Sequence, residues 1–363
     1  MTNRVYNFGA GPATLPASIL YDAQQEFLNW HDLGMSVCEV GHRTEDFIQL
    51  LEQAEADLRE LLAIPSTYTV MFLGGPARMQ FAMLPMNLLA AQQQGAYLIS
   101  GLWSAMAFEE ASKIAKAYCL VSAESMKFKR TPPLDCLQLK PNTAYLYFTP
   151  NETVHGVRFH EVPRVGDIPL VADMTSCLLS EPLNINEYGL IFAGAQKNIS
   201  IAGLTVVIIR NELLSQAVGK VIPTMLDYRT HAIHRSLYAT PPTFNCYLAA
   251  KMFSWIKTQG GVSVLHEQNR MKAAKLYDYI DQSSFYYCDV EKNSRSLVNI
   301  CFGTYQRELE AAFVDQAAQE GLVALKGHRA VGGLRASLYN AMPLQGVDAL
   351  LTFMHRFAEN HSR

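Results

Sequence analysis

The sequence predicts an α/β protein, with a large domain built on a mostly parallel mixed sheet covered by helices and a smaller C-terminal α/β domain. Apolar runs of strand length alternate with helical patterns through much of the first 260 residues, as in sheets that helices cover on both faces. After Gly260 and Gly261 the pattern changes, which indicates a second, smaller unit. The 363 residues suffice for two domains, which we expect at 16–258 and at 1–15 with 259–363.

Six apolar runs bounded by turn residues have the length and composition of strands. They are Thr69–Phe72, Gly95–Ile99, Thr143–Phe148, Leu170–Ala172, Leu190–Ala193 and Leu204–Ile209. A helix is expected over Glu45–Leu62, where apolar residues recur at helical spacing. The C-terminal part predicts a helix over 262–280, a strand over 297–302, a helix over 309–319 and a final helix from Val347 onward.

Charge and composition exclude several classes of partner. The net charge of −3 gives no basic footprint for nucleic acid or an anionic membrane. The longest aliphatic run, Leu204–Ile209, is too short to span a bilayer, and the first 16 residues hold no apolar stretch of secretory type. We therefore expect a cytoplasmic protein without nucleic-acid or membrane partners.

Seven cysteines are spread along the chain without a C-x-x-C pair or metal-type spacing. They are Cys38, Cys119, Cys136, Cys177, Cys246, Cys288 and Cys301. Free cysteine is usually buried, so we expect reduced and mostly buried thiols and no metal site.

Lys197 follows directly on a hydrophobic strand that begins at Leu190. Desolvation at such a position disfavours the charged amine, lowers its pKa and makes it a better nucleophile towards an aldehyde. The alternative is a loop lysine whose stem lies on apolar surface while its head stays in water.

Asp173 ends another short apolar strand, at the edge where α/β sheets bind ligands. A carboxylate there is suited to stabilise a pyridinium N–H. The alternative is a helix N-cap.

Gly74, Gly75 and Pro76 link a strand to a helix, with Pro76 expected at the first helical position. Helix N-termini bind phosphate through free backbone N–H groups, and because Pro76 has none, Ala77 and Arg78 must supply them. An ordinary strand-to-helix turn is the alternative.

Trp103 lies just beyond the Gly95–Ile99 strand, at the same predicted edge of the sheet. Its indole is suited to stack on a flat aromatic cofactor, although most tryptophans are core or interface residues.

Two groups of basic residues flanked by glycine, at 41–43 and 326–335, are candidate anion sites in a chain of net negative charge. Arginine binds carboxylate bidentately, and histidine with arginine can share a phosphate. Solvated surface charge is the alternative.

Taken together, these segments resemble the phosphoserine aminotransferases, class V pyridoxal-phosphate enzymes of fold type I, over essentially the whole chain. The matching segments are Asn7-Phe8 with Gly11-Pro12-Ala13, Glu39–Arg43, Pro150–Thr153, Ala193–Asn198, Thr240–Phe244 and Lys326–Pro343. The resemblance implies transfer of an amino group from L-glutamate to 3-phosphohydroxypyruvate, with pyridoxal 5′-phosphate as cofactor. It also leaves open a phosphorylated hydroxythreonine of pyridoxine biosynthesis as a substrate.

The resemblance also assigns site residues. Lys197 would hold the cofactor as a Schiff base and act as catalytic base, and Asp173 would pair with the pyridine nitrogen. Cofactor contacts are expected from Ala77, Arg78, Trp103, Thr153, Asp173, Gln196, Lys197 and Thr240. Substrate contacts are expected from His42, Arg43, His328, Arg329 and Arg335. A homodimer is implied, with Thr240 and the segment His231–Tyr238 reaching into the partner's site.

The chain departs from the family pattern at the cofactor phosphate. Gly75-Pro76-Ala77 replaces a run of small residues, and Ala239 stands where an asparagine is usual. One amide hydrogen bond to a charged group contributes about 1.5–3 kcal/mol, so we expect weaker cofactor retention.

Two other functions stay open on sequence alone. One is another fold-type-I enzyme, such as an aminotransferase for a different keto acid or a sulfur-mobilising lyase, although none of the seven thiols stands out as reactive. The other is a non-catalytic scaffold that has lost cofactor binding, which the departures at Pro76, Ala77 and Ala239 suggest.

Overall fold

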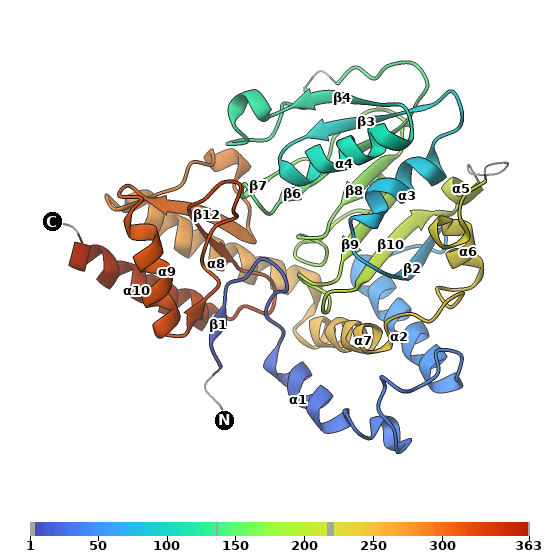
Figure 1. Cartoon of the computed structure of the whole chain (residues 1–363), viewed down its shortest axis with the longest axis horizontal. Coiled ribbons are helices and arrows are strands. Elements are labelled where there is room, and N and C mark those ends of the chain that lie inside the picture. The colour runs from blue at the N-terminus through green and yellow to red at the C-terminus, as the bar shows by residue number, and fades with distance from the viewer. Residues whose placement is uncertain (1–3, 136, 216–220, 362–363) are drawn as a thin grey trace.

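A seven-stranded sheet forms the centre of the computed structural model, which describes residues 4–135, 137–215 and 221–361 (Figure 1). The strand order is β2-β10-β9-β8-β5-β3-β4. In chain order these are β2 (Tyr68–Gly74), β3 (Gln94–Ile99), β4 (Ala117–Ser122), β5 (Thr143–Phe148), β8 (Leu170–Asp173), β9 (Leu190–Gly194) and β10 (Leu204–Arg210). β10 is antiparallel to both neighbours, β2 and β9, and the remaining pairs are parallel. The predicted mostly parallel mixed sheet is confirmed.

The strands that the sequence predicts are the buried ones. β8 and β9 are buried at every residue, and β5 and β10 at almost every residue, so their sequences are near-continuous apolar runs. β4 lacks such a run because it is an edge strand that is mostly half-exposed, and the sequence does not predict it.

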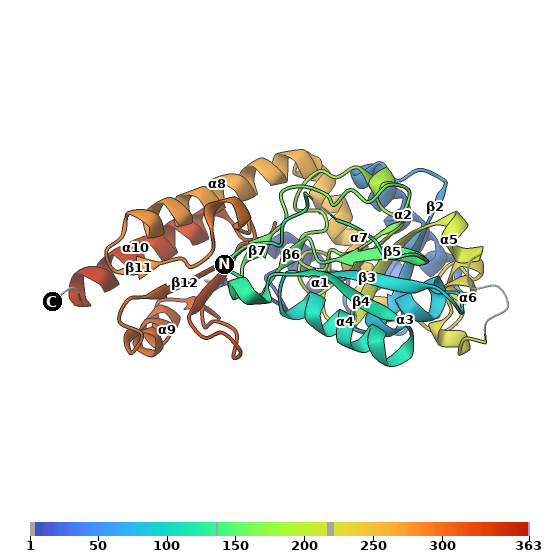
Figure 2. The ribbon, with the colours of Figure 1, turned by 90° about the horizontal axis from the view of Figure 1, so that it is seen from above.

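Helices cover both faces of the sheet (Figure 2). One face packs on α2 (Glu45–Leu62) and α7 (Thr243–Thr258), and the other on α3 (Met79–Leu88) and α4 (Leu102–Ile114). The shorter helices α1 (Ala17–Glu26), α5 (Asn211–Leu214) and α6 (Tyr228–Ile233) lie in the same part of the chain. No helix among the described residues is both long and apolar enough to cross a membrane.

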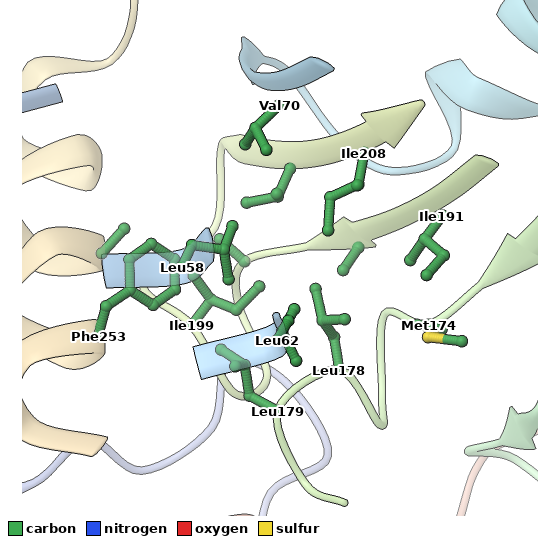
Figure 3. Packing of buried hydrophobic residues seen from close by; sticks show 14 of the residues in the cluster. Leu58, Leu62, Val70, Met174, Leu178, Leu179, Ile191, Ile199, Ile208 and Phe253 are labelled. Carbon is green, nitrogen blue, oxygen red and sulfur yellow. The ribbon is translucent and has the colours of Figure 1, made fainter. Parts of the chain in front are cut away.

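Figure 3 shows the core beneath the first face. Leu58 of α2 and Phe253 of α7 lie in one buried cluster with Val70, Ile191 and Ile208 of the sheet. The predicted helix over Glu45–Leu62 has the bounds of α2, because its apolar stripe faces this core.

The C-terminal part has its own core around a three-stranded sheet of β11 (Tyr286–Tyr287), β12 (Asn299–Thr304) and β14 (Leu334–Ser337). It also contains α8 (Gly261–Gln282), α9 (Leu309–Gln319) and α10 (Leu344–His361). The N-terminal strand β1 (Tyr6–Asn7) pairs with β13 (Leu322–Val323), and Phe8 belongs to this second core. These contacts support our division into two domains, which stays a proposal.

Pro76 does not occupy the first position of a helix. The regular helix α3 begins at Met79, three residues later. Gly75 turns the chain with φ +118°, and Met79 N–H then bonds to the Pro76 carbonyl, so a tight turn precedes the helix. The expectation failed because proline marks the start of a tight turn as readily as the start of a helix.

The described cysteines are all free thiols, and Cys136 lies outside the described residues. Of the six described cysteines only Cys177 and Cys246 are buried, while Cys288 and Cys301 are half-buried and Cys38 and Cys119 are exposed. The expectation that the thiols are mostly buried was therefore wrong.

Candidate active site

The carboxyl ends of the parallel strands β5, β8 and β9 meet at a cavity beside α3 and α4. Seven of the predicted residues line this one cavity, namely Ala77, Arg78, Trp103, Thr153, Asp173, Gln196 and Lys197. Parallel strands end at the same edge of a sheet, which is where α/β proteins bind ligands. The topology therefore gathers residues that lie more than a hundred positions apart.

Lys197 is buried, with 9% of its surface exposed, three residues after β9. Its Nζ donates a hydrogen bond to Thr153 Oγ1 and lies 5.9 Å from the centre of the Trp103 ring. Burial lowers the pKa of the amine from 10.5 to about 8, although Asp173 opposes the shift. About a tenth of such amines is neutral at pH 7, against about one in three thousand at the usual pKa.

Asp173 ends β8 and is also buried. Desolvation raises the pKa of its carboxyl, while hydrogen bonds from Thr175 and the charge of Lys197 act in the opposite direction. The Thr175 N–H donates to Asp173 Oδ1 at 3.0 Å, but residues 174–180 form turns rather than an α-helix. Asp173 is therefore no helix N-cap, and it places a carboxylate in the cavity with Lys197.

Trp103 is the second residue of α4, half-buried at the cavity wall. The Arg78 guanidinium carbon lies 4.9 Å from the centre of its ring, a cation–π contact. The indole Nε1 is buried and has no hydrogen-bond partner among the described residues. The cavity wall thus includes an aromatic ring with a cation beside it.

The loop before α3 offers backbone donors to the same cavity. Among the described groups none accepts from the N–H of Ala77 or Arg78. Gln196 lies close to this loop at Gly194. A Cβ added to Gly194 would lie 2.7 Å from Gln196 Oε1 and 3.0 Å from the Ala77 Cβ. Two free N–H groups near a helix start, beside an amide, form a site suited to phosphate.

The N-terminal segment crosses the lysine loop. Ala13 N–H bonds to the Gln196 carbonyl, and a Cβ on Gly11 would lie 3.3 Å from Lys197 Cγ. Gly11 has φ +148°, a conformation that favours glycine. This crossing restricts the conformations of the Lys197 side chain.

Arg335 on β14, in the C-terminal part of the chain, contacts one residue of the cavity wall. Its Nη1 donates to the Thr153 carbonyl at 3.4 Å, and its Nε is buried without a described partner. His328 lies in an adjoining cavity with His155, and burial lowers its pKa, with Arg335 and the exposed Arg329 adding to the shift. Two arginines, together with His328, thus lie near residues of the Lys197 cavity.

Three further predicted residues lie outside the wall around Lys197, as Arg335, His328 and Arg329 do. Among the described residues, His42, Arg43 and Thr240 are not part of the wall around Lys197. Arg43 donates to the Tyr238 carbonyl at 3.4 Å, and Thr240 is exposed beside a second cavity that Pro76 also lines. In a single subunit these residues are separate from the lysine.

The cavity also contains residues that the sequence did not single out for it. These are Phe81, Thr149, Asn151, Thr175 and Ser176. Thr149 and Asn151 directly follow β5, so their place after a buried strand was an available signal. Thr175 and Ser176 lie just beyond the end of β8, and only the fold shows that they line the cavity.

The aminotransferase class-V family model matches residues 5–350 of the chain. A phosphoserine aminotransferase of Legionella pneumophila (strain Lens) is 62% identical over 99% of this chain and 100% of its own length. One from Coxiella burnetii (strain RSA 493 / Nine Mile phase I) is 46% identical, over 99% of both chains.

Solved structures agree with these matches. The phosphoserine aminotransferase from Bacillus circulans subsp. alkalophilus superposes with a TM-score of 0.96 at 44% identity, over 99% of both chains. The pyridoxal-phosphate-bound phosphoserine aminotransferase from Trichomonas vaginalis gives a TM-score of 0.90 at 36% identity, over 97% of this chain and 100% of its own.

The lowered pKa of Lys197 predicts how its reactivity depends on pH. In cofactor-free protein, reductive methylation of Lys197 by formaldehyde and cyanoborohydride should reach half its maximal rate near pH 8, measured by mass spectrometry of the peptide. Asp173→Asn should move this midpoint to lower pH, because the carboxylate favours the charged amine.

Lys257 is the internal control, because the hydrogen bonds that it donates to Asp57 and Glu60 raise its pKa, and its midpoint should lie at higher pH. A midpoint for Lys197 near 10.5, the ordinary lysine value, would contradict the account.

Proposed function

This chain belongs to the phosphoserine aminotransferases of the aminotransferase class-V family, and we propose that it transfers the amino group of L-glutamate to 3-phosphohydroxypyruvate. The products are 2-oxoglutarate and O-phospho-L-serine, a step of serine biosynthesis. The enzyme is a transaminase that depends on pyridoxal 5′-phosphate. The observation that carries the proposal is the buried Lys197 amine in one cavity with Asp173 and Trp103.

The residues of the cavity fit this cofactor. The free N–H groups of Ala77 and Arg78, with Gln196 beside them, would hold its phosphate. The Trp103 face would cover its ring, Thr153 would contact its phenolic oxygen, and the Asp173 carboxylate would face its pyridine nitrogen. When bound, pyridoxal phosphate supplies an aldehyde carbon for amines and a ring that withdraws electrons from the substrate.

Lys197 has two tasks in this proposal. A pKa of about 8 leaves enough neutral amine to attack an aldehyde. The same amine would take up the proton that the substrate Cα loses and hold it for return, while the bound cofactor would supply the electron sink. A base with a pKa near the working pH serves both directions of proton transfer.

Asp173 would keep the pyridine nitrogen protonated. Burial makes an unpaired carboxylate costly, so this group favours a cationic N–H opposite it. Protonation of the ring nitrogen strengthens the electron withdrawal on which the reaction depends.

Both substrates carry an α-carboxylate and a second anionic group. The arginine and histidine residues that the sequence predicts as anion sites are suited to bind these two groups. We assign the α-carboxylate to Arg335, whose buried Nε lacks a described partner, together with Arg43. His328 and Arg329, with His42, would face the phosphate of one substrate or the side-chain carboxylate of the other.

We further propose a homodimer with shared sites. His42, Arg43 and Thr240 belong to our set of site residues but lie apart from Lys197 in their own subunit. An isologous interface would bring them, with His231–Tyr238, to the cavity of the partner. Ala239 offers no side-chain donor there, so we expect weaker retention of the cofactor phosphate than an asparagine would give.

The proposal includes a cytoplasmic location. The described cysteines are all free thiols, as is usual for proteins of a reducing compartment.

Acceptor specificity tests the reaction. With glutamate as donor, kcat/KM for 3-phosphohydroxypyruvate should exceed that for pyruvate or oxaloacetate by about 100-fold, because acceptors without the phosphate lose the charge-assisted hydrogen bonds assigned to it. Arg329→Met should reduce this ratio about tenfold.

Arg356→Ala, a control at an exposed ion pair on α10, should leave the acceptor ratio unchanged. Equal kcat/KM values for the three acceptors would overturn the phosphate assignment.

Mixed dimers test the shared site. The Lys197→Ala and Arg43→Ala variants should each be nearly inactive. When their subunits are mixed in equal amounts, half the dimers contain one subunit of each kind and therefore one intact site of two. The mixture should recover roughly a quarter of wild-type activity.

Hybrids of Lys197→Ala with Asp173→Asn are the matched control. Both residues line one cavity of one subunit, so no hybrid site is intact and activity should stay absent. If the Lys197→Ala and Arg43→Ala hybrids also stay inactive, Arg43 does not act across the interface.

A further inference from the structure

Glu152 is a second buried carboxylate at the active site, for which the proposed chemistry has no use. It ends the two-residue strand β6 (Asn151–Glu152), which pairs with β7 (Val157–Arg158), and its surface is 0% exposed. Burial raises the pKa of this carboxyl to about 7, against hydrogen bonds from Ser104 and Trp103, and Asp173 contributes to the rise. Burying a carboxylate is unfavourable unless hydrogen-bond partners within the protein replace the water that it loses.

Those partners are the first residues of α4. Glu152 Oε2 accepts from Trp103 N–H at 3.1 Å, and Oε1 accepts from Ser104 N–H at 2.8 Å and from Ser104 Oγ at 2.7 Å. A helix leaves its first N–H groups unpaired, and a residue at the N-cap normally accepts from them. Here Gly101 stands at the N-cap and has no side chain, so Glu152 supplies the acceptor from a strand 48 residues away.

The glycine makes room for this arrangement. A Cβ on Gly101 would lie 2.5 Å from Glu152 Cδ, too close for any real contact. The carboxylate therefore occupies the space where a conventional capping side chain would start. Any side chain at 101 would displace it.

The contact joins two parts of the cofactor cavity. Glu152 accepts a hydrogen bond from the backbone N–H of Trp103. The centre of the Trp103 ring lies 5.9 Å from Lys197 Nζ. Thr153, the next residue after Glu152, accepts a hydrogen bond from Lys197 Nζ. A hydrogen bond at the start of α4 thus sets where the indole lies relative to the lysine.

We propose that Glu152 is a positioning residue that fixes Trp103 over the cofactor ring and thereby sets the affinity of the enzyme for pyridoxal phosphate. This inference rests on the proposed function, since it requires that the cofactor binds at Lys197. Glu152 touches no reacting atom in this account. Its charge also raises the pKa of Lys197, but the contact to which we assign the effect on cofactor affinity is the hydrogen bond from Trp103. Its effect on the cofactor therefore depends on the indole.

A double-mutant cycle measures this dependence. The dissociation constant of pyridoxal phosphate is determined by fluorescence titration of cofactor-free wild type, Glu152→Gln, Trp103→Ala and the double variant. Glutamine keeps the volume of the side chain but places an N–H₂ group against one of the helix N–H donors. Glu152→Gln should weaken binding about tenfold when Trp103 is present and less than about twofold when it is absent.

A thermal melt of each cofactor-free variant separates positioning from stability. The loss of Tm caused by Glu152→Gln should be the same with and without Trp103, whereas the loss of affinity should not. Glu212→Gln, which removes an exposed carboxylate near the start of α5, is the matched control and should leave cofactor affinity unchanged.

Gly101→Ala tests the same contact from the helix side and covers the case in which Glu152→Gln does not fold. It should weaken cofactor binding in the wild-type background and not in Trp103→Ala. Equal losses of affinity in both backgrounds, or no loss, would overturn the positioning role while the proposed function stands. A wild type that binds no pyridoxal phosphate would overturn the proposed function itself.

Discussion

The structure depends on burying one amine beside one carboxylate. Lys197 loses hydration at the end of β9, and the nearby Asp173 carboxylate recovers part of that loss. The effect of burial is larger than that of Asp173, so the pKa of Lys197 falls to about 8, whereas the pKa of a lysine in an exposed ion pair rises. Chemistry at this amine requires that the surrounding elements keep water out and keep the carboxylate close.

The fold meets this requirement through parallel strands. β5, β8 and β9 end at one edge, and the segments that follow them bring Thr153, Asp173 and Lys197 together without any need for proximity in sequence. At Gly11 the N-terminal segment lies against Lys197, and Arg335 of β14 donates a hydrogen bond to the Thr153 carbonyl. Residues from several separate segments thus share one cavity, which explains why contacts such as that of Glu152 with α4 matter to it.

The sequence predicted the elements whose pattern is set by burial, such as α2 and the strands around β9, and it placed Asp173 and Lys197 at strand ends. It could not predict that β10 runs antiparallel, because a buried run has no direction in its composition. Nor could it reveal Glu152 as the acceptor for α4, since that hydrogen bond joins segments far apart in the chain. The prediction that Pro76 begins a helix was wrong, because proline is common both at helix starts and in tight turns.

A spectral titration of the cofactor-free protein with pyridoxal phosphate, followed by glutamate, tests the central role of Lys197 most directly. The account predicts a saturable visible absorption band that glutamate removes and that Lys197→Ala lacks, and borohydride should bleach this band while it fixes a pyridoxyl group to Lys197. A wild-type protein without the band, or a Lys197→Ala variant with the same band, would contradict it.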